Sequence, residues 1–182
     1  LVILVQASGR RAWCPTSALP PRNVQLANEL KLVGVVPAFN EAHVLDSTVK
    51  GLHRIPELGA VWVVDDGSTD ETARVAREAG AEVTRLPRNR GKGAALNHAF
   101  RAIEADVYLV VDADLGEQVQ HLRSLLVPVL TGRADMAVAG FDRSRRRVRA
   151  GGLGVVMGIA RAGIRWLTGA RVAEPLSGQR VL

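Results

Sequence analysis

The chain has 182 residues, of which 47% are hydrophobic and 23% are charged, and its formal net charge is +6. This composition is ordinary for one folded domain with a full core, and it argues against a disordered chain. The longest apolar runs are shorter than the roughly 20 residues that a membrane-spanning helix needs. A single cysteine, Cys14, excludes an internal disulfide framework and fits a reducing, cytoplasmic compartment.

Positive charge is concentrated in one part of the chain. Residues 143–171 hold eight arginines and no acidic residue, so this segment carries +8 while the whole chain carries +6. A single basic segment indicates a local anionic partner and not nucleic-acid binding over the whole surface. Three Phe, three Trp and one Tyr also make a poor stacking platform for single strands. We therefore expect no nucleic-acid partner.

The first 28 residues show no regular pattern. Their apolar run over residues 1–5 is shorter than the core of a signal peptide, and no starting Met or positive charge precedes it. The sequence predicts a poorly structured leader over residues 1–28 and one domain over residues 29–182.

From residue 31 onward, apolar runs alternate with helical stretches. Strands are expected over 32–36, 61–64, 83–86, 107–111 and 136–139, and helices over 41–53, 68–79, 93–104 and 118–130. Ser68 and Glu71 have the spacing of a capping box at the second helix, Gly80 ends it, and Pro128 bends the fourth. Continuously apolar strands that alternate with helices predict an α/β domain with a mostly parallel sheet.

Two of the expected strands end on pairs of carboxylates. Asp65 and Asp66 follow the strand over 61–64, and Asp112 and Asp114 follow the strand over 107–111. In an open parallel sheet, ligands bind beyond the carboxyl ends of the strands. All four acids are therefore expected at the same edge of the sheet.

The D-x-D pair at 112–114 suggests a metal site. In extended backbone, residues i and i+2 point the same way, and two carboxylates offer hard oxygen ligands to Mg²⁺ or Mn²⁺. Such a site leaves positions for the phosphates of a nucleotide-diphosphate leaving group. A calcium loop fails because Arg123 stands where a bidentate Glu is required. Asp65 and Asp66 also suit ordinary turn chemistry, and Asp70 suits a helix N-terminus.

Five motifs occur in a fixed order, and together they resemble a known family. They are PAFNE (37–41), VDDGSTDET (64–72), RNRGKGAALNHAF (88–100), DAD (112–114) and PLSGQR (175–180). This order resembles the nucleotide-sugar half of a family 2 glycosyltransferase with the Rossmann-like GT-A fold. It is similar to the branch of dolichyl-phosphate mannose synthases and bacterial polyprenyl-phosphate sugar transferases. The resemblance runs from about residue 32 to the end of the chain.

The resemblance implies roles for individual residues. Nucleotide contacts are implied for Pro37, Ala38, Asn40, Glu41, Asp65 and Asp66, with Asp65 supporting Asp66. Lys92 is implied to lie near the donor, where a lysine acts on phosphate as a point charge. Asp112 is implied to approach the sugar or ribose, and Asp114 to bind metal and diphosphate. Both aspartates count as catalytic and as metal ligands.

Two parts of the catalytic machinery stay open. Some relatives supply a further metal ligand two residues after the D-x-D, where this chain has Gly116. Glu174, just before PLSGQR, is the candidate general base, whereas an ionised phosphate acceptor needs no base. The chain is also expected to end before the acceptor-side segment of the family is complete, so that it is truncated at its C-terminus.

The sequence thus predicts a metal-dependent glycosyltransferase of hexosyltransferase type, acting on a nucleotide-diphosphate sugar. Two alternatives stand beside it: a nucleotide-sugar-binding module without turnover, and a sugar nucleotidylyltransferase. A dehydrogenase is disfavoured because Gly152, Gly154 and Gly158 follow an arginine-rich loop and not a first strand.

The arginine run Arg143–Arg149 has two interpretations. It is either a solvated loop or a contact for a lipid-phosphate acceptor or anionic membrane surface. The second interpretation implies a cytoplasmic protein that associates peripherally with a membrane.

Overall fold

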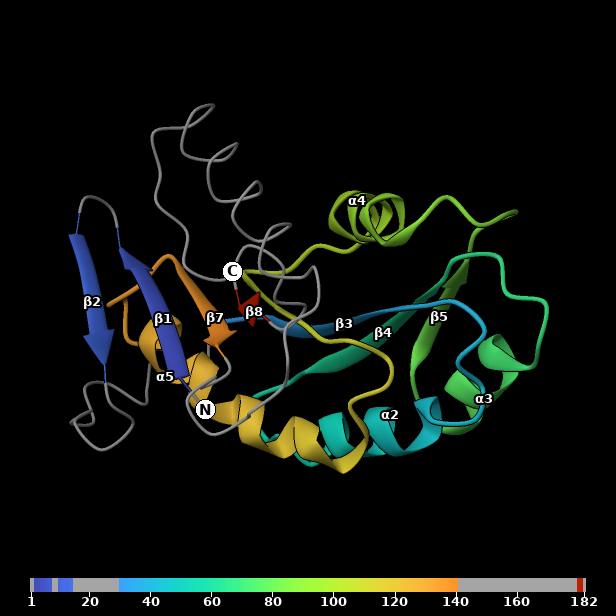
Figure 1. The fold of residues 1–182 in the computed structure, drawn as a ribbon, viewed down its shortest axis with the longest axis horizontal. Helices are drawn as coiled ribbons and strands as arrows, with labels where there is room; N and C mark the ends of the chain where they lie inside the picture. Colours follow the sequence, from blue (N-terminus) through green and yellow to red (C-terminus); the bar gives the residue numbers. More distant parts are fainter. Residues whose placement is uncertain (1, 8–9, 15–29, 141–179, 182) are drawn as a thin grey trace, which may run out of the picture.

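The computed structural model describes residues 2–7, 10–14, 30–140 and 180–181, and these form one mixed sheet with helices on both faces (Figure 1). The strand order is β2-β1-β7-β8-β6-β3-β4-β5. The strands are β1 (Val2–Ala7), β2 (Arg10–Cys14), β3 (Leu32–Ala38), β4 (Ala60–Asp65), β5 (Glu82–Arg85), β6 (Val107–Val110), β7 (Met136–Gly140) and β8 (Arg180–Val181).

The part of the sheet made by β6, β3, β4 and β5 is parallel throughout. All seven residues of β3 are buried, because successive side chains enter the cores on opposite faces. Leu32 and Val36 belong to one apolar cluster, and Val33 and Val35 belong to the other. The five strands expected from the apolar runs are confirmed, and so is the α/β class.

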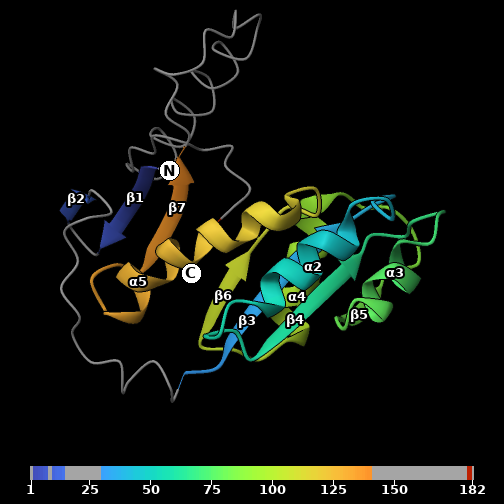
Figure 2. The same cartoon turned by 90° about the horizontal axis from the view of Figure 1, so that it is seen from below.

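The helices form a layer on each side of this sheet. They are α2 (Leu45–His53), α3 (Thr72–Glu78), α4 (Lys92–Ala102), the 3₁₀ helix η1 (Gly116–Leu122) and α5 (Arg123–Leu130). α4 lies on one face, and α2, α3 and α5 lie on the other (Figures 1 and 2). Among the described residues, no helix has both the length and the apolar character needed to span a membrane.

Three helix starts differ from expectation. The predicted capping box at Ser68 and Glu71 is wrong: α3 begins at Thr72 and has no side-chain cap, because the Ser68 hydroxyl accepts a hydrogen bond from the Asn40 amide instead. The first helix begins at Leu45, after a turn, and the fourth divides into η1 and then α5 with Pro128 inside it. Gly80 follows α3 with a φ of +96°, which confirms the expected stop.

The N-terminal residues carry strands where the sequence predicts a poorly structured leader. β1 pairs antiparallel with β7 over five positions and with β2 over five more. A run of Val, Ile and Leu favours extended structure, and β1 pairs with the side of β7 that β8 does not occupy. The division of the chain at residue 28 stays a prediction. Arg143–Arg149, Glu174 and most of the PLSGQR motif lie outside the described residues.

Candidate active site

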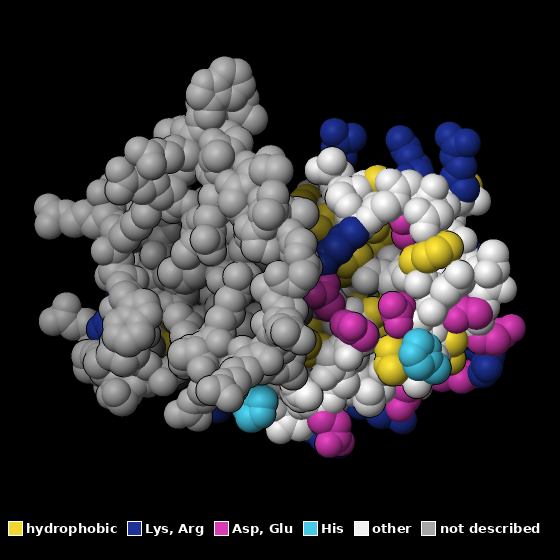
Figure 3. Space-filling view, viewed as in Figure 1, with side chains coloured by type: hydrophobic (Ala, Val, Ile, Leu, Met, Phe, Trp, Pro, Cys, Tyr) yellow, Lys and Arg dark blue, Asp and Glu magenta, His cyan; other side chains and the backbone are white. Residues whose placement is uncertain are grey.

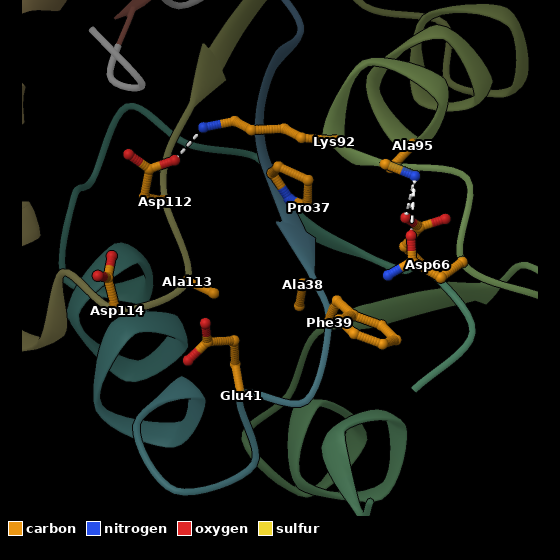
Figure 4. Close-up of a pocket in the computed structure, with 12 residues that line it drawn as sticks. Pro37, Ala38, Phe39, Glu41, Asp66, Lys92, Ala95, Asp112, Ala113 and Asp114 are labelled. Carbon is orange, nitrogen blue, oxygen red and sulfur yellow. Dashed lines mark hydrogen bonds and ion pairs between the residues drawn. The ribbon is translucent and has the colours of Figure 1, made fainter. Parts of the chain in front are cut away.

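A pocket of about 320 Å³ opens where β3, β4 and β6 end. Its size is that of a small-molecule site, and its position at the carboxyl ends of parallel strands is where such sheets bind ligands. Acidic side chains gather near the centre of this face, beside a basic one (Figure 3). The lining residues are Pro37, Ala38, Phe39, Glu41, Asp66, Asn89, Gly91, Lys92, Ala95, Asp112, Ala113 and Asp114 (Figure 4).

Most of the side chains that sequence reasoning selected meet in this pocket. They are Pro37, Ala38, Glu41, Asp66, Lys92, Asp112 and Asp114. Asn40 and Asp65 do not line it, and Glu174 lies outside the described residues. The structure therefore supports the expected grouping of the strand ends, while the role of each residue stays a prediction.

Asp66 holds the loop that precedes α4. Its side chain is buried, and its carboxylate accepts hydrogen bonds from the Arg90 amide at 2.9 and 3.1 Å and from the Gly91 amide at 2.7 Å. Gly91 stands before α4 with a φ of +85°. Asp66 thus sets the position of the helix start that brings Lys92 to the pocket (Figure 4).

Asp65 supports the turn after β4 and does not face the pocket. Its side chain is fully buried, and Oδ1 accepts a hydrogen bond from the Ser68 amide at 2.8 Å. Oδ2 lies 3.2 Å from Arg85 Nε as an ion pair but takes no hydrogen bond. A buried carboxylate without such partners is costly, so these contacts explain why an acid is tolerated here.

The D-x-D segment is a turn and not the extended backbone that the sequence predicts. β6 ends at Val110, and the chain turns at Ala113 and Asp114. The Lys92 ammonium group makes an ion pair with Asp112 across the pocket, whereas the Asp114 side chain is exposed (Figure 4). Both carboxylates still line the same pocket, because the turn carries them past the end of the strand.

Thr48 fixes this turn from a distant part of the chain. Its buried hydroxyl donates to the Ala113 carbonyl at 2.7 Å and accepts from the Gly116 amide at 2.8 Å. Sequence reasoning missed Thr48, because it lies on α2, 65 residues before Ala113, where no motif singles it out.

The donor atoms present suit a magnesium-type ion that shares its ligands with a substrate. Within the described residues, no three His, Cys, Asp or Glu side chains come together as a metal cage. Mg²⁺ is commonly held by one or two carboxylates together with substrate phosphates. Asp112 and Asp114 provide that number, whereas Gly116, at the position left open for a further ligand, has no side chain to offer.

The loops after β3 and β4 are joined by side-chain hydrogen bonds. The amides of Asn40, Glu41 and Ala42 donate to Ser68 Oγ, Thr72 Oγ1 and Asp70 Oδ2, at 2.9, 2.9 and 3.2 Å.

The ionised form of Asp70 is favoured by this network. Partial loss of hydration tends to raise the pKa of Asp70, but hydrogen bonds from the side chain and amide of Thr72 and from the Ala42 amide outweigh it and lower the pKa from its ordinary value. Sequence reasoning expected Asp70 merely at a helix N-terminus, so this link to the PAFNE loop was missed.

Phe39 is a pocket-lining residue that sequence reasoning missed. It is 41% exposed, and it lines the pocket (Figure 4). An exposed aromatic face offers a stacking surface for a planar base. The sequence signal that could have identified Phe39 was its position inside the PAFNE motif, between residues that were predicted to contact the nucleotide.

Residues 35–168 match the profile of the family described as glycosyl transferase family 2. The match covers well over half of the chain, so the chain belongs to this family. The family predicted from the five motifs is confirmed, whereas the dolichyl-phosphate mannose synthase branch stays a prediction.

A curated relative is Protein RfbJ of Shigella flexneri. It is 30% identical over 104 residues, which cover 57% of this chain and 80% of RfbJ.

Two solved structures confirm the predicted GT-A fold. Mannosyl-3-phosphoglycerate synthase from Rubrobacter xylanophilus is 25% identical with a TM-score of 0.70, over 91% of this chain and 58% of that one. Glucosyl-3-phosphoglycerate synthase from Mycobacterium tuberculosis, in complex with Mn²⁺, UDP-glucose and phosphoglyceric acid, is 26% identical with a TM-score of 0.68, over 90% of this chain and 61% of that one. The chain therefore spans about three fifths of the length of these structures.

Proposed function

We propose that this chain provides the donor site of a metal-dependent glycosyltransferase that uses a nucleotide-diphosphate sugar. The observation that carries the proposal is the pocket where Lys92, Asp112 and Asp114 meet at the carboxyl ends of the parallel strands. Family membership and the Mn²⁺ and UDP-glucose bound to the mycobacterial neighbour support the same conclusion.

In this proposal the two sides of the pocket act on different parts of the donor. Asp112 and Asp114 hold Mg²⁺ or Mn²⁺ together with the diphosphate, and Lys92 contacts a phosphate oxygen as a point charge. When bound, the divalent ion neutralises negative charge on the diphosphate as it leaves. Phe39 and Glu41, which follow β3 at the other side of the pocket, contact the nucleoside.

The acceptor is proposed to carry a phosphate or carboxylate group. The mycobacterial neighbour binds phosphoglyceric acid, and the run Arg143–Arg149 provides concentrated positive charge in this chain. A lipid phosphate at a cytoplasmic membrane surface has the same chemistry. Glu174 serves as general base if the attacking group is a hydroxyl, whereas an ionised phosphate attacks without one.

A thermal-unfolding panel with UDP, GDP and CDP tests the donor site. A ligand at 100 times its dissociation constant stabilises a protein by about 2.7 kcal/mol. We expect one diphosphate to raise the unfolding temperature in the presence of Mn²⁺, and a smaller shift with EDTA. If none of the three shifts the temperature with Mn²⁺ present, the proposed donor site is wrong.

Product analysis separates the two alternatives from the proposal. A glycosyltransferase releases nucleoside diphosphate from UDP-glucose when an acceptor such as phosphoglycerate is present. A nucleotidylyltransferase instead forms pyrophosphate from UTP and a sugar phosphate. A binding module shows the thermal shift without either product.

A further inference from the structure

The structure contains a set of hydrogen bonds that positions one wall of the proposed donor pocket. We propose that Ser68, Asp70 and Thr72, named here the clasp, are positioning residues for nucleotide binding, and that they act through Glu41. The inference rests on the proposed donor site, but none of the three clasp residues lines the pocket.

The clasp binds three consecutive amides. Ser68, Thr72 and Asp70 accept hydrogen bonds from the backbone N–H groups of residues 40, 41 and 42, in that order. These amides precede α2, whose own N-terminus has no side-chain cap. Backbone N–H groups in a loop have no partner in a helix or sheet, so they need side chains or water as acceptors. The clasp supplies these partners from a loop about 30 residues further along the chain.

The contact is also reciprocal. The Asn40 side-chain oxygen accepts a hydrogen bond from the Thr69 amide at 2.8 Å. The Asp70 carboxylate in turn accepts from the Thr72 amide at 3.0 Å and from the Thr72 hydroxyl, so the members of the clasp hold one another. Hydrogen bonds run in both directions between the two loops, which fixes their relative position more strongly than one contact does.

The held segment has a backbone conformation that needs support. Asn40 has a φ of +56°, in the left-handed region that residues other than glycine rarely adopt. Such a conformation persists where surrounding contacts enforce it. Glu41 follows directly, and its side chain lines the pocket from the side of α2 (Figure 4). The clasp therefore determines where the Glu41 carboxylate lies relative to Asp112 and Asp114.

Thr72 allows the sharpest test, because its side chain is fully buried and its hydroxyl accepts from the Glu41 amide. Thr72→Val keeps the shape of the side chain and removes the acceptor, whereas Thr72→Ser keeps the acceptor. Thr131→Val is the matched control, since it removes a hydroxyl that bonds the Val127 carbonyl at the end of α5, outside the pocket lining. Calorimetric titration with UDP and Mn²⁺ gives the dissociation constant for each variant.

We expect Thr72→Val to weaken UDP binding about tenfold, and Thr72→Ser and Thr131→Val to bind within about twofold of the parent protein. Glu41→Gln provides the second arm of a double-mutant cycle. If the clasp acts through Glu41, adding Thr72→Val to Glu41→Gln weakens binding by less than about twofold. A full tenfold further loss in that background contradicts the inference.

Two further results complete the test. Asp70→Asn, at an exposed position, replaces Thr72→Val if the latter does not fold, and it should also weaken UDP binding. Equal affinity of the clasp variants and the parent protein overturns the inference while leaving the donor site intact. Absence of binding of UDP, GDP and CDP by the parent protein instead overturns the proposed function, so the two failures are distinguishable.

Discussion

The carboxyl ends of β4 and β6 have the same sequence pattern but different structures. Each is a valine-rich strand followed by two carboxylates. At the end of β4, Asp65 and Asp66 are 0% and 3% exposed, and their oxygens accept hydrogen bonds from backbone amides. After β6, Asp114 is exposed, and Asp112 is partly exposed and paired with a lysine side chain.

The difference lies in what surrounds each strand end. The loop over residues 88–91 crosses close to the turn after β4 and brings amide donors to Asp66, so these carboxylates are used to hold backbone. The turn after β6 is held by Thr48 on α2, whose hydroxyl bonds the Ala113 carbonyl and the Gly116 amide. The side chains of Asp112 and Asp114 take no part in these bonds and line the pocket. The acids at the β4 end therefore hold backbone, although Asp66 also lines the pocket, whereas the acids at the β6 end line the pocket without bonding the backbone of a neighbouring loop in any contact described above.

The largest expected effect is at Gly67, in the turn after β4. Gly67 has a φ of +72°, and a Cβ there would lie 2.6 Å from the Arg88 carbonyl carbon. Gly67→Ala should destabilise the protein by about 3 kcal/mol, from left-handed strain and backbone displacement. Denaturant unfolding measures this loss.

Gly93→Ala is the control for that substitution. A Cβ at Gly93 meets nothing within 4 Å, and the residue lies in α4, so alanine should be neutral or stabilise by up to about 1 kcal/mol. Equal stability of the two variants would mean that the loops do not approach as closely as described.

The second prediction compares two Asp→Asn changes directly. Asp65→Asn places an amide NH₂ opposite Arg85 in a buried site, and we expect a loss of about 2 kcal/mol, moderated because Arg85 is half exposed. Asp114→Asn, at an exposed position, should change the free energy of unfolding by less than about 0.5 kcal/mol. If Asp114→Asn were the more destabilising, the contrast between the two strand ends would be wrong.

Lys92→Met should have opposite effects on the binding of UDP and of Mn²⁺ at the β6 end. UDP affinity with Mn²⁺ should fall about tenfold, because a cation near the phosphates is lost. Affinity for Mn²⁺ alone should rise, because Lys92 no longer competes for Asp112. Titrations with UDP and with Mn²⁺ measure the two constants. Lys50→Met, which disrupts an exposed ion pair with Asp46 on α2, is the control and should change neither.

The smallest effect concerns pH. Because the pKa of Asp70 is lowered from its ordinary 3.8 in the folded protein, its contribution to stability is fully present above that value. It is lost as pH falls through the lower folded-state pKa. An NMR titration of the Asp70 carboxyl should give a midpoint below 3.8, and Asp70→Asn should remove the corresponding part of the acid destabilisation. A midpoint at or above 3.8 would contradict the hydrogen bonds described.

Much of the fold was predictable because the inner parallel strands β3, β4 and β6 are runs of mostly buried apolar residues, whereas β5 at the edge is only partly buried. β3, with seven buried residues, is the clearest case. The helix starts were less predictable, because Ser68 has the sequence signature of a cap but bonds to Asn40 on another loop. A side chain that hydrogen-bonds a distant amide leaves no periodic signal in its own neighbourhood.

The site residues could also be predicted only in part from the sequence. The motifs selected seven of the pocket-lining residues, because the carboxyl ends of parallel strands share one edge. They did not predict that Asp65 and Asp66 are buried while Asp112 and Asp114 are not, since burial depends on loops that fold over the strand end. Thr48 and Thr72 were missed for the same reason: both act on backbone groups that are far away in the sequence.

The most direct test of the contrast is calorimetric titration of UDP, with and without Mn²⁺, into Asp114→Asn and Asp46→Asn. Asp46 is a half-exposed aspartate on α2 outside the pocket lining, so its replacement controls for the loss of one negative charge. The account predicts that Asp46→Asn binds UDP in a Mn²⁺-dependent manner like the parent protein. It predicts that Asp114→Asn loses the Mn²⁺-dependent part of the affinity by at least about tenfold while remaining folded. Unchanged Mn²⁺-dependent binding by Asp114→Asn would contradict the assignment of the β6 end as the ligand-binding edge.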